Sequence, residues 1–128
     1  NAQPNTVASV RADVATGIVK CAKGYLEEGV PFLSRAIETA RGLDDNDARW
    51  WSAAMWMSYA TGCRHDEELL KMAEEFSKSS RDGVSTGVLV WTMSILIDTF
   101  LDHARRPDAE NIMHELQRLI ERNHQARY

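Results

Sequence analysis

Acidic and histidine side chains are the groups in this chain that could carry out acid–base or metal chemistry. Glu121 and His124 have the spacing of the Glu-x-x-His unit of carboxylate-bridged di-iron proteins, and Glu110 and His114 lie one helical turn apart. A di-iron bundle uses that unit twice and adds carboxylates from two further helices. This chain contains the unit once. We therefore predict no metal site and no cofactor.

Asp98 is the one acidic residue within a long apolar segment, 88–101. A buried carboxylate must be paired or neutralised, and its pKa would then be shifted. Alternatively, Asp98 marks the single exposed strip of a helix or bonds to a neighbouring loop, and we favour this second interpretation. The sequence also has no catalytic triad spacing, glycine-rich phosphate loop or nucleotide fingerprint. We predict that the chain is not an enzyme.

Large aromatic and sulfur-containing side chains are concentrated in one segment, which contains Trp50, Trp51, Met55, Trp56, Met57 and Tyr59. The adjacent Trp50 and Trp51 project about 100° apart on a helix, so they cannot share one core direction. The cluster either packs between helices or forms a contact surface, where Trp, Tyr, Met and Arg are enriched. The candidate partner-binding residues are Arg49, Trp50, Trp56, Tyr59 and Trp91.

Length and composition indicate one soluble helical domain over residues 1–128. Apolar residues make up 44% and charged residues 27%, close to the averages for globular proteins. Three Pro and seven Gly are too few for a β-rich fold, which needs frequent turns. The net charge of −4 argues against nucleic acid as a partner of this domain. Because the chain opens with Asn1, we expect a fragment of a longer chain.

The sequence predicts neither a membrane span nor a cysteine-based site. The longest apolar stretch, Val88 to Leu101, is shorter than the roughly 20 residues that a transmembrane helix needs. Cys21 and Cys63 form no CxxC pair, so reduced thiols are the expectation. We expect a cytoplasmic protein, with export, and then a disulfide, as the alternative.

Six segments have helical character. Glycines or polar loops separate them, and short loops favour antiparallel neighbours. The glycines Gly24 and Gly42 end the first two segments, and Pro31 predicts that the second helix starts near Gly29 or is kinked. The fifth is apolar nearly all round, which predicts neighbours on most sides. The segments cover about residues 6–23, 25–41, 48–61, 66–80, 84–104 and 107–126.

A spacing of four and then three residues recurs in the even-numbered segments. The three sets are offset by 40 and then 43 residues, a period typical of paired-helix repeats. They are Gly29, Leu33 and Ala36; Leu69, Ala73 and Phe76; and Ile112, Leu116 and Leu119. We predict that these sets mark equivalent layers of three stacked helical hairpins. An irregular helical bundle is the alternative, because any amphipathic helix contains such spacings.

With these residues in place, the chain resembles the tetratricopeptide family. Gly17 stands at the small-residue position of the first helix, and Gly24 at the turn before the second. Gly29, Leu33 and Ala36 then follow as the small, bulky and small residues of that family. Residues 24–45 are also similar to the longer repeats of helical sensor regions in large bacterial transcription regulators. The resemblance implies stacked helical hairpins whose first helices line a shallow groove.

The leading hypothesis is a non-catalytic module that binds a protein or peptide, as a regulatory or sensor segment of a larger signalling protein. The alternative is a helical bundle that senses a small molecule in a pocket lined by Trp and Met. If Trp50 or Trp51 is exposed, the chain could also pair with itself. By the resemblance, the groove would present residues such as Lys20, Arg49, Trp50, Ser52, Met55, Trp56, Tyr59, Trp91, Thr92 and Ile95.

Overall fold

The computed structural model describes residues 6–60 and 65–126, and this part of the chain consists of six α-helices without a β-strand. The predicted all-helical class is confirmed. Each helix begins within about two residues of its predicted start, because glycines and polar loops mark the boundaries. The helices are α1 (Val7–Ala22), α2 (Leu26–Arg41), α3 (Asn46–Ala60), α4 (Asp66–Lys78), α5 (Thr86–Asp102) and α6 (Arg106–Ala126).

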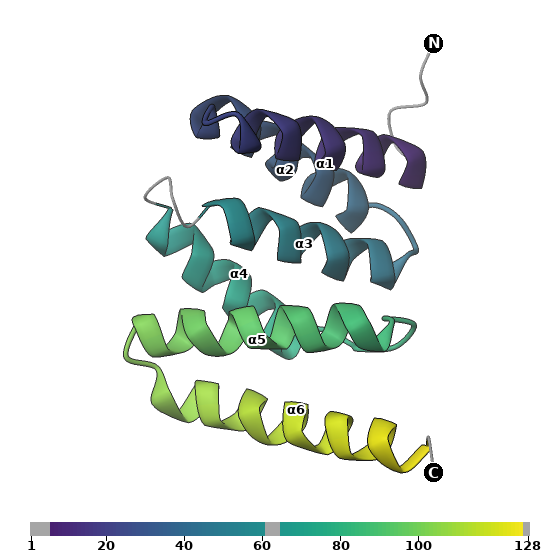
Figure 1. The fold of residues 1–128 in the computed structure, drawn as a ribbon, viewed down its shortest axis with the longest axis vertical. Coiled ribbons are helices and arrows are strands. Elements are labelled where there is room, and N and C mark those ends of the chain that lie inside the picture. The colour runs from purple at the N-terminus through teal and green to yellow at the C-terminus, as the bar shows by residue number, and fades with distance from the viewer. Residues whose placement is uncertain (1–5, 61–64, 127–128) are drawn as a thin grey trace.

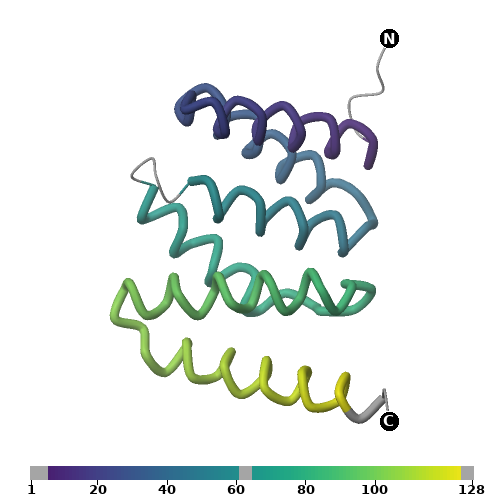
Figure 2. Tube along the Cα trace, in the orientation of Figure 1, coloured from purple at the N-terminus to yellow at the C-terminus, as the bar shows by residue number. Residues whose placement is uncertain are grey.

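Consecutive helices pair antiparallel, and the three pairs stack along the long axis of the molecule (Figure 1). The pair α1/α2 lies at one end and α5/α6 at the other. The odd-numbered helices α1, α3 and α5 lie side by side on the near face, with α2 and α4 behind them (Figure 2). This arrangement is the predicted stack of three hairpins rather than an irregular bundle.

The stack has a period of 40 residues along its second helices. These helices begin at Leu26, Asp66 and Arg106, at equal intervals. The predicted offset of 43 residues for the third set is therefore wrong by three residues, almost one helical turn. The reason is that α6 carries several apolar residues at spacings of three and four, so more than one set satisfies the pattern.

The first helix begins and ends with specific local interactions. The Thr6 hydroxyl accepts a hydrogen bond from the Ser9 N–H at 3.1 Å, and the Ser9 hydroxyl accepts one from the Thr6 N–H at 3.0 Å. This reciprocal capping box satisfies two N–H groups that the helix leaves open. After α1, Gly24 has a φ of 89°, a left-handed conformation that favours glycine. The chain can therefore turn at once into α2.

Helix α2 begins at Leu26, one residue from the start of the predicted segment 25–41, and runs through Pro31 instead of starting near Gly29, the first of the two alternatives for this proline. Glu27 and Glu28 occupy its first turn, where negative charge is favourable. Pro31 removes only the bond to the carbonyl of Glu27, on an exposed side of the helix where water can take its place. An early proline is therefore tolerated.

The first pair is packed so closely that backbone touches backbone. A Cβ built at Gly29 would lie 2.7 Å from the Gly17 carbonyl oxygen and 2.5 Å from the Cys21 sulfur. A Cβ at Gly17 would in turn lie 2.8 Å from a side-chain carbon of Leu33. Glycine at both positions lets α1 and α2 approach to this distance. This close crossing is the structural reason for glycine at positions 17 and 29.

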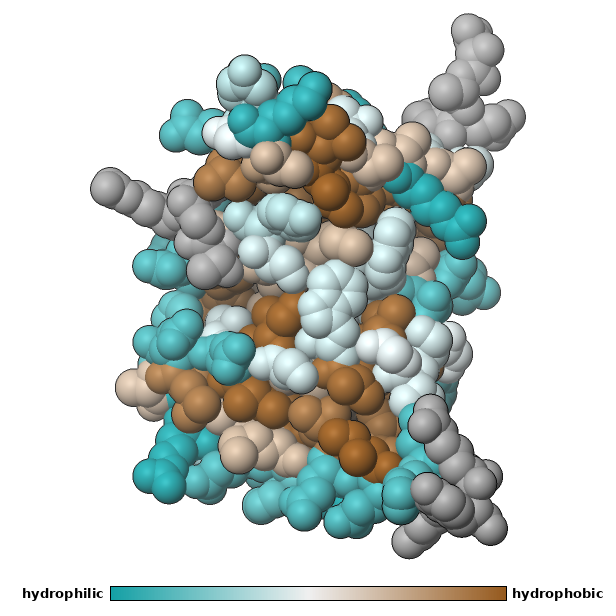
Figure 3. Space-filling model, viewed as in Figure 1, coloured by the Kyte–Doolittle hydropathy of each residue, from teal (hydrophilic) through white to brown (hydrophobic). Residues whose placement is uncertain are grey.

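Burial is not uniform along the stack. The side chains of Leu33, Trp50 and Phe76 are fully buried in the first two pairs and the junction between them. In contrast, α5 is covered on fewer sides than its composition predicted, and Leu101 keeps half of its surface exposed. Apolar side chains form a band over α5 and α6 on the near face (Figure 3). The third pair therefore carries an apolar face without a neighbour in the described part of the chain.

We expect Gly29→Ala to lower the free energy of unfolding by about 1–2 kcal/mol. The added methyl group overpacks the contact with the Gly17 backbone, which outweighs the gain in helix propensity. Urea unfolding monitored by circular dichroism measures this change.

Gly87→Ala in the first turn of α5 is the matched control. Among the described residues, no heavy atom lies within 4 Å of a Cβ built at Gly87. This substitution should raise the free energy of unfolding by up to about 1 kcal/mol, because alanine restricts the unfolded chain and favours helix. Equal effects at both glycines would contradict the close crossing of α1 and α2.

Candidate functional site

Two of the five candidate residues, Trp50 and Trp56, lie in the core. Their side chains are 0% and 5% exposed. Trp50 packs edge-on against Phe76, with ring centroids 5.3 Å apart, and Trp56 donates its indole N–H to the Ser34 hydroxyl at 2.8 Å. The prediction is corrected for Trp50, which has no exposed surface and is a packing residue. Trp56 packs in the core as well, but it also lines a pocket between α2 and α4.

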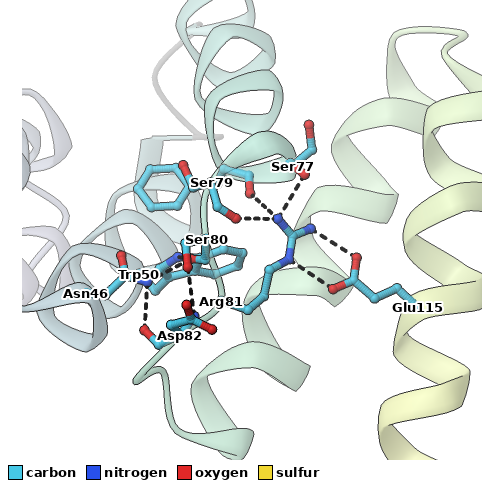
Figure 4. A network of polar contacts seen from close by, with 9 residues as sticks. Asn46, Trp50, Ser77, Ser79, Ser80, Arg81, Asp82 and Glu115 are labelled. Carbon is cyan, nitrogen blue, oxygen red and sulfur yellow. Dashed lines mark hydrogen bonds and ion pairs between the residues drawn. The ribbon is translucent and has the colours of Figure 1, made fainter.

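The indole N–H of Trp50 binds a loop that Arg81 holds in place (Figure 4). Trp50 donates to the Ser80 carbonyl at 3.1 Å, and the Asn46 amide donates to the same carbonyl at 2.7 Å. The Arg81 guanidinium lies 5.2 Å from the Trp50 ring and donates to the carbonyls of Ser77 and Ser79, at the end of α4. Trp50 is thus fixed by its polar edge as well as by its apolar faces.

Arg81 also reaches across to the last helix. Its Nε and Nη2 atoms donate to the two carboxylate oxygens of Glu115 at 2.9 and 3.0 Å. Such a bidentate pair is stronger and more directional than a single contact. One guanidinium therefore caps α4, covers Trp50 and ties α4 to α6.

Arg49 is directed toward the interior rather than toward a binding face. Its Nη1 donates to the Asn46 side chain at 3.3 Å, and its guanidinium lies 6.0 Å from the Phe76 ring. The Arg49 Nε atom is buried and has no hydrogen-bond partner among the described residues. Of the five candidates, Tyr59 and Trp91 are the two aromatic residues that keep part of their surface exposed.

Trp51 belongs to the predicted aromatic cluster but is not among the five candidate partner-binding residues. Trp51 and Trp91 are separated by the 40-residue period, so they occupy matching positions on the neighbouring helices α3 and α5, and both are partly exposed. The same interval relates Met55 to Ile95. The repeat period, applied to the aromatic residues, could have identified Trp51. We define the first-helix face by six residues of α3 and α5 that keep surface exposed: Trp51, Met55, Ser58, Trp91, Ile95 and Asp98.

A shallow hollow of about 220 Å³ adjoins Trp51 at the first turns of α1 and α3. Arg11, Asp45 and Asp47 contribute charged groups to its lining. The carboxylate of Asp45 accepts the Ala48 N–H at 3.0 Å, and that of Asp47 accepts the Ser85 N–H at 2.9 Å. Both carboxylates thus help to fix the loops. The hollow offers both signs of charge beside an indole ring.

A second pocket, of about 250 Å³, lies between α2 and α4. Trp56 and Met72 contribute to its wall, but five of its nine lining residues are charged: Glu38, Arg41, Glu68, Lys71 and Glu75. Burial lowers the pKa of Arg41, but hydrogen bonds and the charges of Glu75 and Glu38 outweigh this effect and raise it. Trp50 and Trp91 do not line the pocket. The pocket thus contains one Trp and one Met in a mostly charged wall, and small-molecule binding there stays a prediction.

The groups considered for chemistry are dispersed. Asp98 is exposed, in agreement with the favoured interpretation. Within residues 6–60 and 65–126, no three His, Cys, Asp or Glu side chains gather where a metal ion could bind. Cys21 is buried, and Cys63 lies outside the described residues. No helix in the described ranges is long and apolar enough to cross a membrane.

Comparison with family models, curated proteins and solved structures found no match to this chain.

We expect Arg81→Ala to lower the free energy of unfolding by about 2–3 kcal/mol, because it leaves the end of α4 and the Glu115 carboxylate without their donor. Near-ultraviolet circular dichroism should lose part of its tryptophan signal, since Trp50 is held by the same loop. Chemical unfolding with both signals measures the change.

Arg106→Ala is the control for the arginine substitution. Arg106 forms an exposed pair with Glu110 on the same helix, and its side chain is 80% exposed. Such pairs contribute about 0.3–0.5 kcal/mol. Comparable losses in the two variants would show that the Arg81 network is not what fixes the junction.

Proposed function

We propose that this chain is a non-catalytic interaction module that binds an extended peptide segment of a partner protein on the first-helix face. The observation that carries the proposal is the matching position of Trp51 and Trp91 on adjacent helices. Tryptophan is the residue type most enriched among those that dominate binding energy. Each of these rings keeps part of its surface exposed on a fixed helical scaffold, so little side-chain entropy is lost on binding.

The spacing of the two rings suggests what the peptide looks like. Packed helices lie about 8–10 Å apart. An extended chain in the polyproline II conformation advances about 3.1 Å per residue with three residues per turn, so side chains three residues apart point to the same side. Two apolar side chains three residues apart would therefore reach Trp51 and Trp91 together. Met55 and Ile95 flank the rings on α3 and α5 with further apolar surface.

A charge at the edge of the face favours a particular composition of the peptide. Asp98 is exposed on α5, one turn from Ile95 and two turns from Trp91, and Arg11 lines the hollow beside Trp51. A peptide with a basic residue close to its contact with Ile95 fits the charge of Asp98. The hollow beside Trp51, lined by Arg11, Asp45 and Asp47, does not favour one sign of charge.

The tetratricopeptide resemblance supports a regulatory or sensor role within a larger signalling protein. Arrays of helical hairpins present an extended surface that suits segments of other proteins. In such a protein, binding of the partner to the first-helix face would be the signal that the partner is present. A small-molecule effector is the alternative, and the pocket between α2 and α4 is where it would bind.

The experiment is selection of peptides on the purified chain from a random display library, followed by fluorescence anisotropy of a selected peptide. We expect Trp51→Ala and Trp91→Ala each to weaken binding about tenfold or more, because each removes a large apolar anchor. Selected peptides should share two apolar residues three positions apart.

Met113→Ala and Lys71→Ala are the controls for peptide binding. Met113 lies on α6 outside the face, and Lys71 lines the pocket between α2 and α4. Neither substitution should change the affinity for the peptide. Binding that survives the loss of both Trp51 and Trp91 but fails in Lys71→Ala would instead support the pocket as the site.

A further inference from the structure

The two junctions of the stack share an ion pair that repeats with the 40-residue period. The Arg41 guanidinium donates to the Glu75 carboxylate across the first junction at 2.6 and 3.2 Å. Across the second junction, the Arg81 guanidinium donates to the Glu115 carboxylate at 2.9 and 3.0 Å. In each case the donor is 34 residues before the acceptor. An arginine at the end of one pair thus binds a glutamate on the second helix of the next.

At the two ends of the stack the same positions carry the opposite charges. One period after Arg81 the chain has Glu121, and one period before Glu75 it has Arg35. In the last pair, Glu121 therefore stands where the earlier pairs have the arginine of the junction. In the first pair, Arg35 stands where the later pairs have the glutamate. An end-to-end junction would again bring opposite charges together, with the signs reversed.

The last pair exposes an apolar face that the earlier pairs bury. Leu33 and Ala73 are 0% exposed, whereas Met113, one period further along, is 46% exposed. Similarly, Met57 is buried by the next pair, but its equivalent Ile97 is partly exposed. Ile97, Met113, Leu116 and Ile120 line a groove of about 370 Å³, and Glu121 lies at this groove.

The first pair has the complementary end. Val19 and Tyr25 are 52% and 56% exposed, and they line a hollow beside α1. Ala15 in the same hollow leaves room for close approach. Arg35 projects from α2 with 62% of its side chain exposed while it pairs with Asp13. In the described part of the chain, all five strongly exposed large apolar residues lie in the first and last pairs: Val19, Tyr25, Leu101, Met113 and Ile120.

We propose that a second copy of this chain continues the stack, with its α1/α2 end seated on the α5/α6 groove and its Arg35 paired with Glu121. In this contact, α1 of the next copy packs on the α5/α6 groove in the same way that α3 packs on the first pair and α5 packs on the second pair. The contact is head-to-tail, so each added copy presents a new groove and the assembly can grow beyond a dimer. This surface is separate from the first-helix face.

Sedimentation velocity over a wide concentration range tests the stacking, with charge-reversal variants. The wild-type chain should sediment faster as its concentration rises, without a limit at the dimer. Arg35→Glu and Glu121→Arg should each weaken self-association about fivefold or more, because like charges then meet at the junction. An equimolar mixture of the two variants should associate again, since every mixed junction has opposite charges.

Three further variants separate the contribution of the apolar groove from that of charge. Ile120→Asp should abolish association, because it buries a charge in the apolar groove. Glu67→Arg and Lys78→Glu make the same changes of charge on exposed sites of α4, away from both ends, and should behave as wild type. An unfolding curve for each variant shows whether it is folded, and the mixture remains informative if Arg35→Glu is less stable.

Three outcomes would overturn the proposal. The first is a wild-type chain that stays monomeric at every concentration, which would leave the groove to another helix or partner. The second is a dimer that Glu121→Arg or Ile120→Asp disrupts and Arg35→Glu does not, because it would show that two α5/α6 ends pair symmetrically. The third is a mixture of the charge-reversal variants that associates no better than each variant alone.

Discussion

The contact on which the stack depends most is the one made by the Arg81 guanidinium. A helix ends with carbonyl groups that need donors, and the α4 carbonyls find one in Arg81. Because the same group pairs with Glu115 and covers the ring of Trp50, it joins the second pair to the third. The fixed loop in turn supplies the Ser80 carbonyl that permits burial of the indole N–H.

The junctions repeat more faithfully than the pairs themselves. Within the first pair, Gly17 and Gly29 allow backbone contact, whereas the second pair is filled by large rings such as Trp50 and Phe76. These interiors have little in common. The Arg–Glu pairs across the junctions, however, recur at one spacing. The sequence is therefore constrained by the geometry between neighbouring pairs, whereas the interior of each pair is filled by different residue types.

This difference explains what could be predicted from the sequence. Helix existence and boundaries follow from local chemistry, such as Gly24 after α1 and the acids that open α4. The register of α6 and the choice between Trp50 and Trp51 depend on how helices face one another, which local spacing does not determine. Either indole could have faced the core. The interval from Trp51 to Trp91 does carry the information, but it can be used only once the period is known to be 40.

The two proposed surfaces would also influence each other. Head-to-tail stacking places α1 of one copy next to α5 of the previous one, so the first-helix faces would become continuous along the assembly. A peptide longer than the face of one copy could then contact two copies, and its binding would favour stacking by the same free energy with which stacking favours its binding. A module with open ends and a lateral binding face can in this way couple recognition of a segment to assembly, without any change in the fold of the single chain.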